Sequence, residues 1–140
     1  MALTTRRLIE SYYERFNAGD WPGFLALLAA DVVHDINQGG REQGRDAFAA
    51  FMARMSRCYQ ERIEELVVMV DPSGSRAAAE FVVAGTYVAT DPGLPEARGQ
   101  RYRLAGGAFF AVADGRITRV TNWYNLEDWL RQVRDGDAAR

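Results

Sequence analysis

One histidine and a few tyrosines are the side chains of this sequence best suited to proton transfer. His34 is the only histidine, and it lies in the short β-branched segment 32–36. An imidazole has an ordinary pKa of about 6.5 and can take up or release a proton near neutral pH. We therefore predict His34 as a general base. Tyr12 or Asn122 would donate a hydrogen bond to a substrate carbonyl oxygen.

A second reading of the same residues is structural. A buried histidine can be satisfied by a single backbone or side-chain partner, and Tyr12 can serve only in helix packing. Asp35 follows His34 directly, and successive side chains of a strand point to opposite faces. Asp35 is kept as a third catalytic candidate because a β-bulge would turn it toward His34.

The composition narrows the class of protein. The 140 residues, 48% of them hydrophobic, are enough for one domain with a real core. Cys58 is the only cysteine, which excludes an internal disulfide and cysteine-based metal sites in one chain. All 17 basic residues are arginines, scattered in a chain of net charge −2, which argues against nucleic-acid binding.

The apolar runs are too short to cross a bilayer, and the first residues show no signal peptide. We therefore predict a soluble, cytoplasmic protein without membrane or nucleic-acid partners. It has a single domain over residues 1–134 and a frayed tail over residues 135–140.

The order of the elements predicts an α+β fold. Apolar residues recur at helical spacing near the start, with Thr4 or Thr5 as N-cap, and Gly19 and Asp20 separate this helix from the next. A strand over 32–36, a turn over 38–40 and a third helix over 45–59 follow. The later segments are four strands and one helix, at about 62–70, 76–90, 100–112, 116–124 and 126–133.

Two segments resemble a known superfamily. Residues 12–20, Tyr-Tyr-Glu-Arg-Phe-Asn-Ala-Gly-Asp, come before an apolar helix and an aspartate, Asp31, that opens a strand. This arrangement resembles the start of NTF2-like proteins, and the late hairpin over residues 107–120 resembles their final strand pair. The resemblance spans about residues 5–133 and is strongest to the ketosteroid-isomerase-related and SnoaL-like branch. It implies a cone of three N-terminal helices packed on a curved, mostly antiparallel sheet that encloses a pocket.

Ketosteroid isomerases use an aspartate base and an oxyanion hole made of a tyrosine and a protonated aspartate. Tyr12 has the family's spacing to Asp20, eight residues further on. The family's base position falls at Ile36, and the protonated aspartate falls near Gly107 or Ala108. Two of the three catalytic groups are therefore missing, which argues against steroid double-bond isomerisation.

The resemblance also implies which strand residues face the cavity, because side chains alternate along a strand. The inward set implied in this way is Val32, His34, Ile36, Phe81, Val83, Gly85, Tyr87, Val120, Asn122 and Tyr124. From it we predict His34, Tyr12 and Asp35 as catalytic residues, and Asn122, Tyr124, Tyr87, Ile36, Phe81 and Val120 as ligand-binding residues. No metal and no cofactor is predicted.

The opposite face of the same strands is more apolar than a solvated face needs to be. It carries Val82, Ala84, Thr86, Ile117 and Trp123. We predict a two-fold homodimer through this outer face.

These observations favour a small-molecule-binding protein, without deciding whether it is an enzyme. One hypothesis is a cofactor-free isomerase or cyclase that transfers a proton on an apolar, carbonyl-bearing substrate. The alternatives are a non-catalytic carrier or sensor that uses the same cavity, and a dimeric interaction module whose interior is only core.

Overall fold

The computed structural model describes residues 1–135 and contains four helices and six strands. The helices are α1 (Ala2–Ala18), α2 (Trp21–Ala26), α3 (Arg45–Cys58) and α4 (Leu126–Asp135). The strands are β1 (Leu28–Ile36), β2 (Gly40–Gln43), β3 (Tyr59–Val70), β4 (Arg76–Tyr87), β5 (Gln100–Ala113) and β6 (Arg116–Tyr124). The chain therefore has the predicted α+β class.

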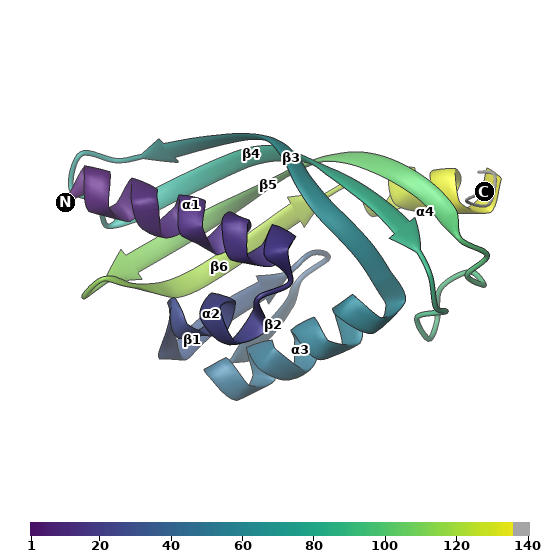
Figure 1. Cartoon of the computed structure of the whole chain (residues 1–140), viewed down its shortest axis with the longest axis horizontal. Helices are drawn as coiled ribbons and strands as arrows, with labels where there is room; N and C mark the ends of the chain where they lie inside the picture. Colours follow the sequence, from purple (N-terminus) through teal and green to yellow (C-terminus); the bar gives the residue numbers. More distant parts are fainter. Residues whose placement is uncertain (136–140) are drawn as a thin grey trace.

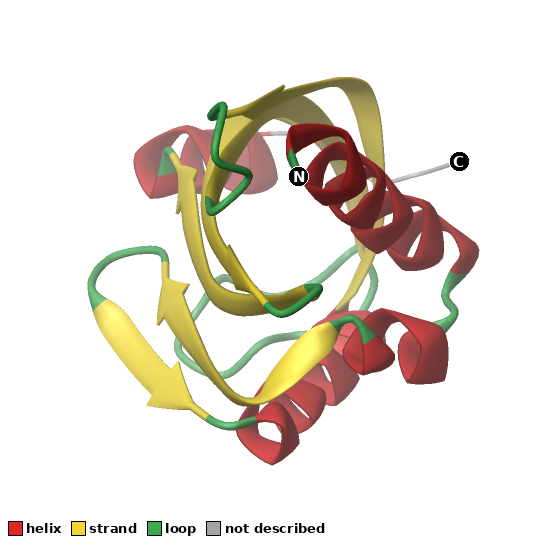
Figure 2. Cartoon of the chain, turned by 90° about the vertical axis from the view of Figure 1, so that its left-hand side faces the viewer, coloured by secondary structure: helices red, strands yellow, loops and turns green. Residues whose placement is uncertain are grey.

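All six strands form one curved sheet in the order β2-β1-β6-β5-β4-β3. Strands β1 and β6 pair in parallel, and every other neighbouring pair is antiparallel. The sheet bends around one side of the molecule, and α1, α2 and α3 lie on the hollow side (Figures 1 and 2). This is the predicted cone, in which helices cover the concave face of the sheet.

Local sequence sets the start of the fold. Gly19 ends α1 in the left-handed conformation, at φ 69°, which glycine adopts without a steric penalty. The side chain of Asp20 then accepts a hydrogen bond from the Gly23 backbone N–H and caps α2. The tight connection places α2 beside α1 at the narrow part of the cone.

Buried apolar side chains form two clusters. The larger one joins α1, α2 and α3 to the concave face and includes Ile9, Phe24, Phe48 and Phe110. The smaller cluster joins α4 to the far ends of β4 and β5 and consists of Tyr87, Tyr102, Leu104, Trp129 and Val133. The two clusters hold the two ends of the cone separately.

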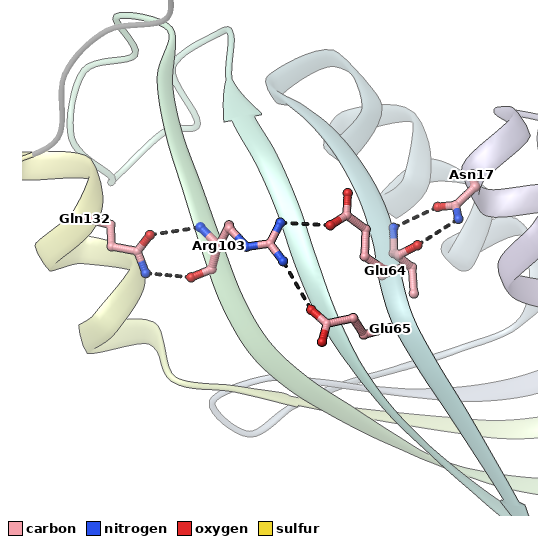
Figure 3. Close-up of polar contacts among 6 residues, drawn as sticks. Asn17, Glu64, Glu65, Arg103 and Gln132 are labelled. Carbon is pink, nitrogen blue, oxygen red and sulfur yellow. Dashed lines mark hydrogen bonds and ion pairs between the residues drawn. The ribbon is translucent and has the colours of Figure 1, made fainter.

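Two side-chain amides tie helices to the sheet (Figure 3). Asn17 of α1 accepts from the Ile63 backbone N–H at 2.8 Å and donates to the Ile63 carbonyl at 2.9 Å. Because β3 is an edge strand, these bonds satisfy backbone groups that no neighbouring strand can reach. Gln132 of α4 makes the equivalent pair of bonds to the backbone of Arg103 in β5.

Several details differ from the prediction. The helix α1 begins at Ala2, so Thr5 lies inside it and its hydroxyl donates to the Gly74 carbonyl at 2.6 Å. The segment after Gly39 forms the short strand β2. Strand β3 begins at Tyr59, whereas β4 already ends at Tyr87.

Ile117 is the one residue of the predicted outer face that the structure places fully in the core. The register of β5 with β6 shifts between Ala111 and Val112, so alternation counted back from Val120 fails at this point. Of the predicted tail, Asp135 belongs to α4, and residues 136–140 lie outside the described residues. No helix within residues 1–135 is both long and apolar enough to cross a membrane.

We expect Asn17→Ala to destabilise the fold, because two backbone groups of Ile63 lose their partner. A loss of roughly 1–3 kcal/mol in the free energy of unfolding is typical when buried donors and acceptors are left unpaired. Urea unfolding measures it. The control is Glu14→Ala on the exposed side of the same helix, which should change stability by less than about 0.5 kcal/mol. Equal stability of the two variants would contradict a role for the Asn17 amide.

Candidate functional site

A cavity of about 760 Å³ lies between the concave face of the sheet and the three N-terminal helices. Its size is within the range of small-molecule sites. Aromatic and apolar side chains form most of the wall, among them Tyr12, Tyr13, Phe16, Trp21, Phe24, Phe48, Phe51, Met52, Ile63, Phe81 and Val83. Polar and charged side chains also line it, among them His34, Arg54, Glu61, Arg62, Asp91 and Asn122.

His34 lies on β1 between two aromatic rings of α3. Its imidazole stacks on Phe48 with 4.2 Å between ring centroids and meets Phe51 edge-on at 4.7 Å. The side chain is only 2% exposed. Burial lowers the pKa of His34 to about 4, and the nearby charge of Asp35 opposes this shift only in part. His34 is therefore neutral at pH 7.

The hydrogen bond of His34 fixes its tautomer. Asn122 Nδ2 lies 3.3 Å from His34 Nε2, and an amide nitrogen can only donate. In this arrangement Nε2 accepts, and the single proton of the neutral ring sits on Nδ1. Nδ1 is buried and has no hydrogen-bond partner among the described residues. The ring thus keeps one donor without a partner, whereas its lone pair is already used.

Two tyrosines of α1 lie deeper in the cavity. The rings of Tyr12 and Tyr13 meet edge-on at 5.0 Å, and both are almost fully buried. Burial raises the pKa of each hydroxyl well above its ordinary value, so both stay protonated. The Tyr13 hydroxyl has no partner within the described chain. No residue pattern distinguished Tyr13 from its neighbour Tyr12, so the sequence analysis did not select it.

The structure brings together most of the residues predicted to face the cavity. Tyr12, His34, Ile36, Phe81, Asn122 and Tyr124 all line it. Asn122 and Tyr124 come from the same face of β6, and the Tyr124 backbone N–H donates to Asn37 Oδ1 at 3.2 Å. Asn122, predicted as a ligand-binding residue, contacts His34 with its side-chain amide.

Three predicted site residues lie elsewhere. Asp35 points to the outer face, where it accepts two hydrogen bonds from Arg41 and one from Thr121 at 2.8 Å. These bonds lower the pKa of Asp35 and keep it ionised. No bulge re-aims it, because β1 pairs without a shift from Val33 to Asp35. Val120 is fully buried in the larger core.

Tyr87 is the third residue placed away from the cavity wall. It packs in the smaller cluster, and its hydroxyl donates to the Pro95 carbonyl at 2.7 Å and accepts from the Asp91 N–H at 2.9 Å. Its inward direction was inferred correctly from the alternation. The strand reaches beyond the cavity at this point, however, and α4 covers it.

Sequence reasoning missed two carboxylates that line the cavity. Asp91 accepts from the Tyr59 hydroxyl at 2.8 Å and lies 4.0 Å from Arg54. Glu61 of β3 accepts from the Tyr102 hydroxyl at 2.5 Å. The available signal for Glu61 was its spacing of two from Tyr59 and Ile63, which puts an acid on a mostly apolar strand face.

The arrangement combines a neutral imidazole, buried hydroxyls and a carboxylate around an apolar space. Neutral donors of this kind can polarise a carbonyl oxygen, and a carboxylate can accept a proton. Within residues 1–135 no group of three or more histidine, cysteine, aspartate or glutamate side chains is placed to hold a metal ion.

Comparisons with known proteins agree with this architecture. Residues 9–120 match the model of the SnoaL-like domain family. A solved structure from Pseudomonas putida KT2440, described as a "putative polyketide cyclase", is 59% identical. It has a TM-score of 0.91, with 92% of this chain and 97% of that chain covered. One from Xanthomonas campestris pv. campestris with the same description is 55% identical, with a TM-score of 0.92 and coverage of 94% and 98%.

More distant structures share the fold alone. An NTF2-like protein from Burkholderia xenovorans LB400 is 15% identical, with a TM-score of 0.76 and coverage of 95% of this chain and 98% of that chain. None of the curated proteins matches the sequence.

The lowered pKa of His34 predicts a pH-dependent stability. Between its unfolded pKa of about 6.5 and its folded pKa of about 4, only the unfolded chain takes up the proton. Stability should therefore be complete above pH 6.5 and fall as the pH drops toward 4. Relative to His34→Phe, which keeps the stack on Phe48, the wild type should lose roughly 2–3 kcal/mol more in this window.

Urea unfolding at several pH values measures this difference, and imidazole NMR resonances report the folded pKa directly. A His34 titration centred near pH 6.5 in the folded protein would contradict the buried, neutral assignment.

Proposed function

The chain belongs to the SnoaL-like family, and from that premise we propose that it binds an apolar, carbonyl-bearing small molecule in its cavity and moves a proton on it. The reaction is an isomerisation or a cyclisation, and it uses side chains alone. A single observation carries the proposal. His34 is a neutral imidazole whose lone pair is held by Asn122 and whose Nδ1–H has no partner among the described residues.

A buried donor without a partner costs about 1–3 kcal/mol, and a ligand oxygen can recover that cost. A carbonyl oxygen that accepts from Nδ1–H becomes polarised, which acidifies the C–H bonds next to it. A neutral imidazole suits this role, because it does not surrender its own proton readily. The sequence prediction of a general base at His34 is thereby replaced by a proposed role as electrophile.

The surroundings of His34 support an apolar substrate. Phe48 and Phe51 enclose the ring, and Ile36, Phe81 and Val83 continue the wall. A flat or multi-ring molecule can stack on such a wall, with few polar groups to satisfy. The solved structures at 59% and 55% identity are described as putative polyketide cyclases, and poly-carbonyl compounds of that kind have the proposed chemistry.

The competing function is non-catalytic binding of the same class of ligand. It is favoured by the absence of the ketosteroid isomerase carboxylates, since those positions fall at Ile36 and near Gly107 or Ala108. Both functions predict binding, so only turnover separates them.

Exchange of α-protons on a model ketone distinguishes catalysis from binding and does not require the natural substrate. We expect the wild type to accelerate deuterium incorporation next to the carbonyl of 2-tetralone, a bicyclic ketone, in D₂O. His34→Phe removes both ring nitrogens but keeps the stack on Phe48, so the rate should fall about 100-fold, as for loss of an oxyanion donor. Proton NMR follows the exchange, and quenching of tryptophan fluorescence follows binding.

The neighbouring variant Asp35→Asn is the matched control, because that side chain lies on the other face of β1, and its exchange rate should stay within a few-fold of wild type. Binding of 2-tetralone without any acceleration by the wild type would favour the carrier function and contradict the enzymatic one.

We further propose that the protein is a two-fold dimer through the convex face of the sheet. Val67, Met69, Phe109 and Trp123 are each about half exposed. Met69 of β3 and Phe109 of β5 lie in one row across β4, since Met69 pairs with Ala78 and Ala78 with Phe109. Val67 lies two residues from Met69 on the same strand. An apolar surface of this kind on long strands favours association between copies.

The dimer prediction is tested with Phe109→Glu, which puts a charge at the centre of this surface. Light scattering at micromolar concentration should give a dimer mass for the wild type and a monomer mass for the variant. Val88→Glu changes an exposed apolar residue outside the sheet and should leave the dimer intact. A monomeric wild type would contradict the proposal.

A further inference from the structure

Three residues in one row across the sheet form an unusual arrangement. Glu61 of β3 pairs with Gly85 of β4, and Gly85 pairs with Tyr102 of β5. A Cβ atom at Gly85 would overlap the ring and the hydroxyl of Tyr102. The ring of Tyr102 therefore crosses β4 over the bare glycine, and its hydroxyl reaches Glu61 Oε2 at 2.5 Å.

The geometry points to Glu61 as the proton acceptor of the proposed reaction, with Tyr102 as its positioning residue. The inference rests on the proposed function, because it supplies the base that His34, with its lone pair on Asn122, does not provide. Glu61 was not among the residues predicted from the sequence, and it does not coincide with Ile36 or Gly107, where the resemblance placed the family's carboxylates.

A purely structural reading is also available for this row. An aromatic ring laid over a strand glycine covers its backbone, and a tyrosine can do this without any catalytic purpose. Two observations favour a catalytic carboxylate. Glu61 lines the cavity, and Tyr102 engages only one of its two oxygens. The other oxygen has no ion-pair partner among residues 1–135.

The surroundings of Glu61 make its carboxylate a stronger base. Protein atoms around the carboxyl raise its pKa through desolvation, while the Tyr102 hydrogen bond acts in the opposite direction. Tyr102 of β5 and Tyr124 of β6 interact electrostatically with Glu61. Arg54 of α3, Tyr59 and Arg62 of β3, and Asp91 line the same cavity. No arginine pairs with Glu61 among the described residues, in contrast to Asp35 and Asp91.

The cavity wall connects Glu61 to His34. Asn122 contacts His34. Burial and the charge of Glu61 raise the pKa of Tyr124, which lies two residues further on the same face of β6. Two residues of a strand span about 6.6 Å. A substrate that reaches both groups is therefore extended, with at least two fused rings or a chain of comparable length.

The proposed step balances without any co-reactant. The Glu61 carboxylate takes a proton from carbon, and the electron pair of the C–H bond moves toward the carbonyl, whose oxygen becomes an enolate held by His34 Nδ1–H. In an isomerisation, protonated Glu61 returns the proton to another carbon of the conjugated system. In a cyclisation, the enolate carbon bonds to a second carbonyl carbon, and Glu61 returns the proton to the new alkoxide.

The experiment again uses α-proton exchange of 2-tetralone in D₂O. Glu61→Gln keeps the size and the hydrogen-bonding shape of the side chain but removes its basicity. We expect the rate at saturation to fall at least about 100-fold, the range typical of a lost general base, with half-saturation nearly unchanged. Glu80→Gln, an exposed glutamate on the outer face of β4, is the control and should behave as wild type.

Tyr102→Phe tests the positioning role separately from folding. Its hydroxyl stabilises the Glu61 anion, so removing it should raise the pKa of Glu61 and move the midpoint of the pH–rate profile upward. A structural role alone would lower stability without moving this midpoint.

The outcomes separate the two claims. If the wild type and His34→Phe differ but Glu61→Gln exchanges at the wild-type rate, the proposed function stands and the role of Glu61 is overturned. If the wild type does not accelerate exchange at all, the proposed function is overturned and the Glu61 inference falls with it. A pH–rate midpoint unchanged in Tyr102→Phe overturns the positioning role.

Discussion

The unbroken pairing of β4 with β5 is the constraint on which the rest of the molecule depends. Twelve consecutive residue pairs join Arg76–Tyr87 to Ala111–Gln100 without a shift. Alternation along these two strands assigns every side chain to the concave or the convex face. Phe81, Val83 and Tyr102 thereby face inward, and Phe109 faces outward. The neighbouring strands bend around this pair through irregularities, between Glu64 and Val67 in β3 and between Ala111 and Val112.

Desolvation explains why similar chemical groups behave differently on the two faces. Asp35 lies outside and has Arg41 and Thr121 as partners, so its charge is stabilised and its pKa is lowered. His34, one residue away, points inward between two phenylalanines and loses its charge. Glu61 is on the inner face as well, and the pKa of its carboxyl is raised. Neighbouring residues of one strand thus point to opposite faces. A side chain on the outer face can form an ion pair, whereas burial on the inner face shifts the pKa of a group, as proton transfer requires.

The site differs from the three-group arrangement of ketosteroid isomerases. Only Tyr12 stands at a matching position, and the structure places Tyr13 and its unpartnered hydroxyl beside it. The proposed base comes from β3, on the opposite edge of the sheet from β1 and β2, and the curl of the sheet brings it to the same cavity. The fold therefore offers several strands from which a carboxylate can reach the same space, which is one reason why fold alone does not decide the chemistry.

The sequence by itself determined the elements and most of their directions. Helical spacing, strand alternation and the Gly19–Asp20 junction are local signals, and they placed four helices and five of the six strands. The alternation of side chains along a strand, combined with the resemblance to NTF2-like proteins, predicted that His34, Ile36, Asn122 and Tyr124 face the cavity. These inferences succeeded because each depends on a few adjacent residues.

Only the tertiary structure decided which inward side chains share the cavity. Glu61 and Tyr102 are 41 residues apart, and their contact depends on the register of three strands and on the missing side chain of Gly85. Tyr87 points inward as predicted, yet α4 covers it. Ile117 is buried because the register of β5 with β6 shifts between Ala111 and Val112, and the alternation pattern of the sequence does not show this shift. Contacts between distant strands and the desolvation they produce are properties of the whole sheet, and no local pattern of residues carries them.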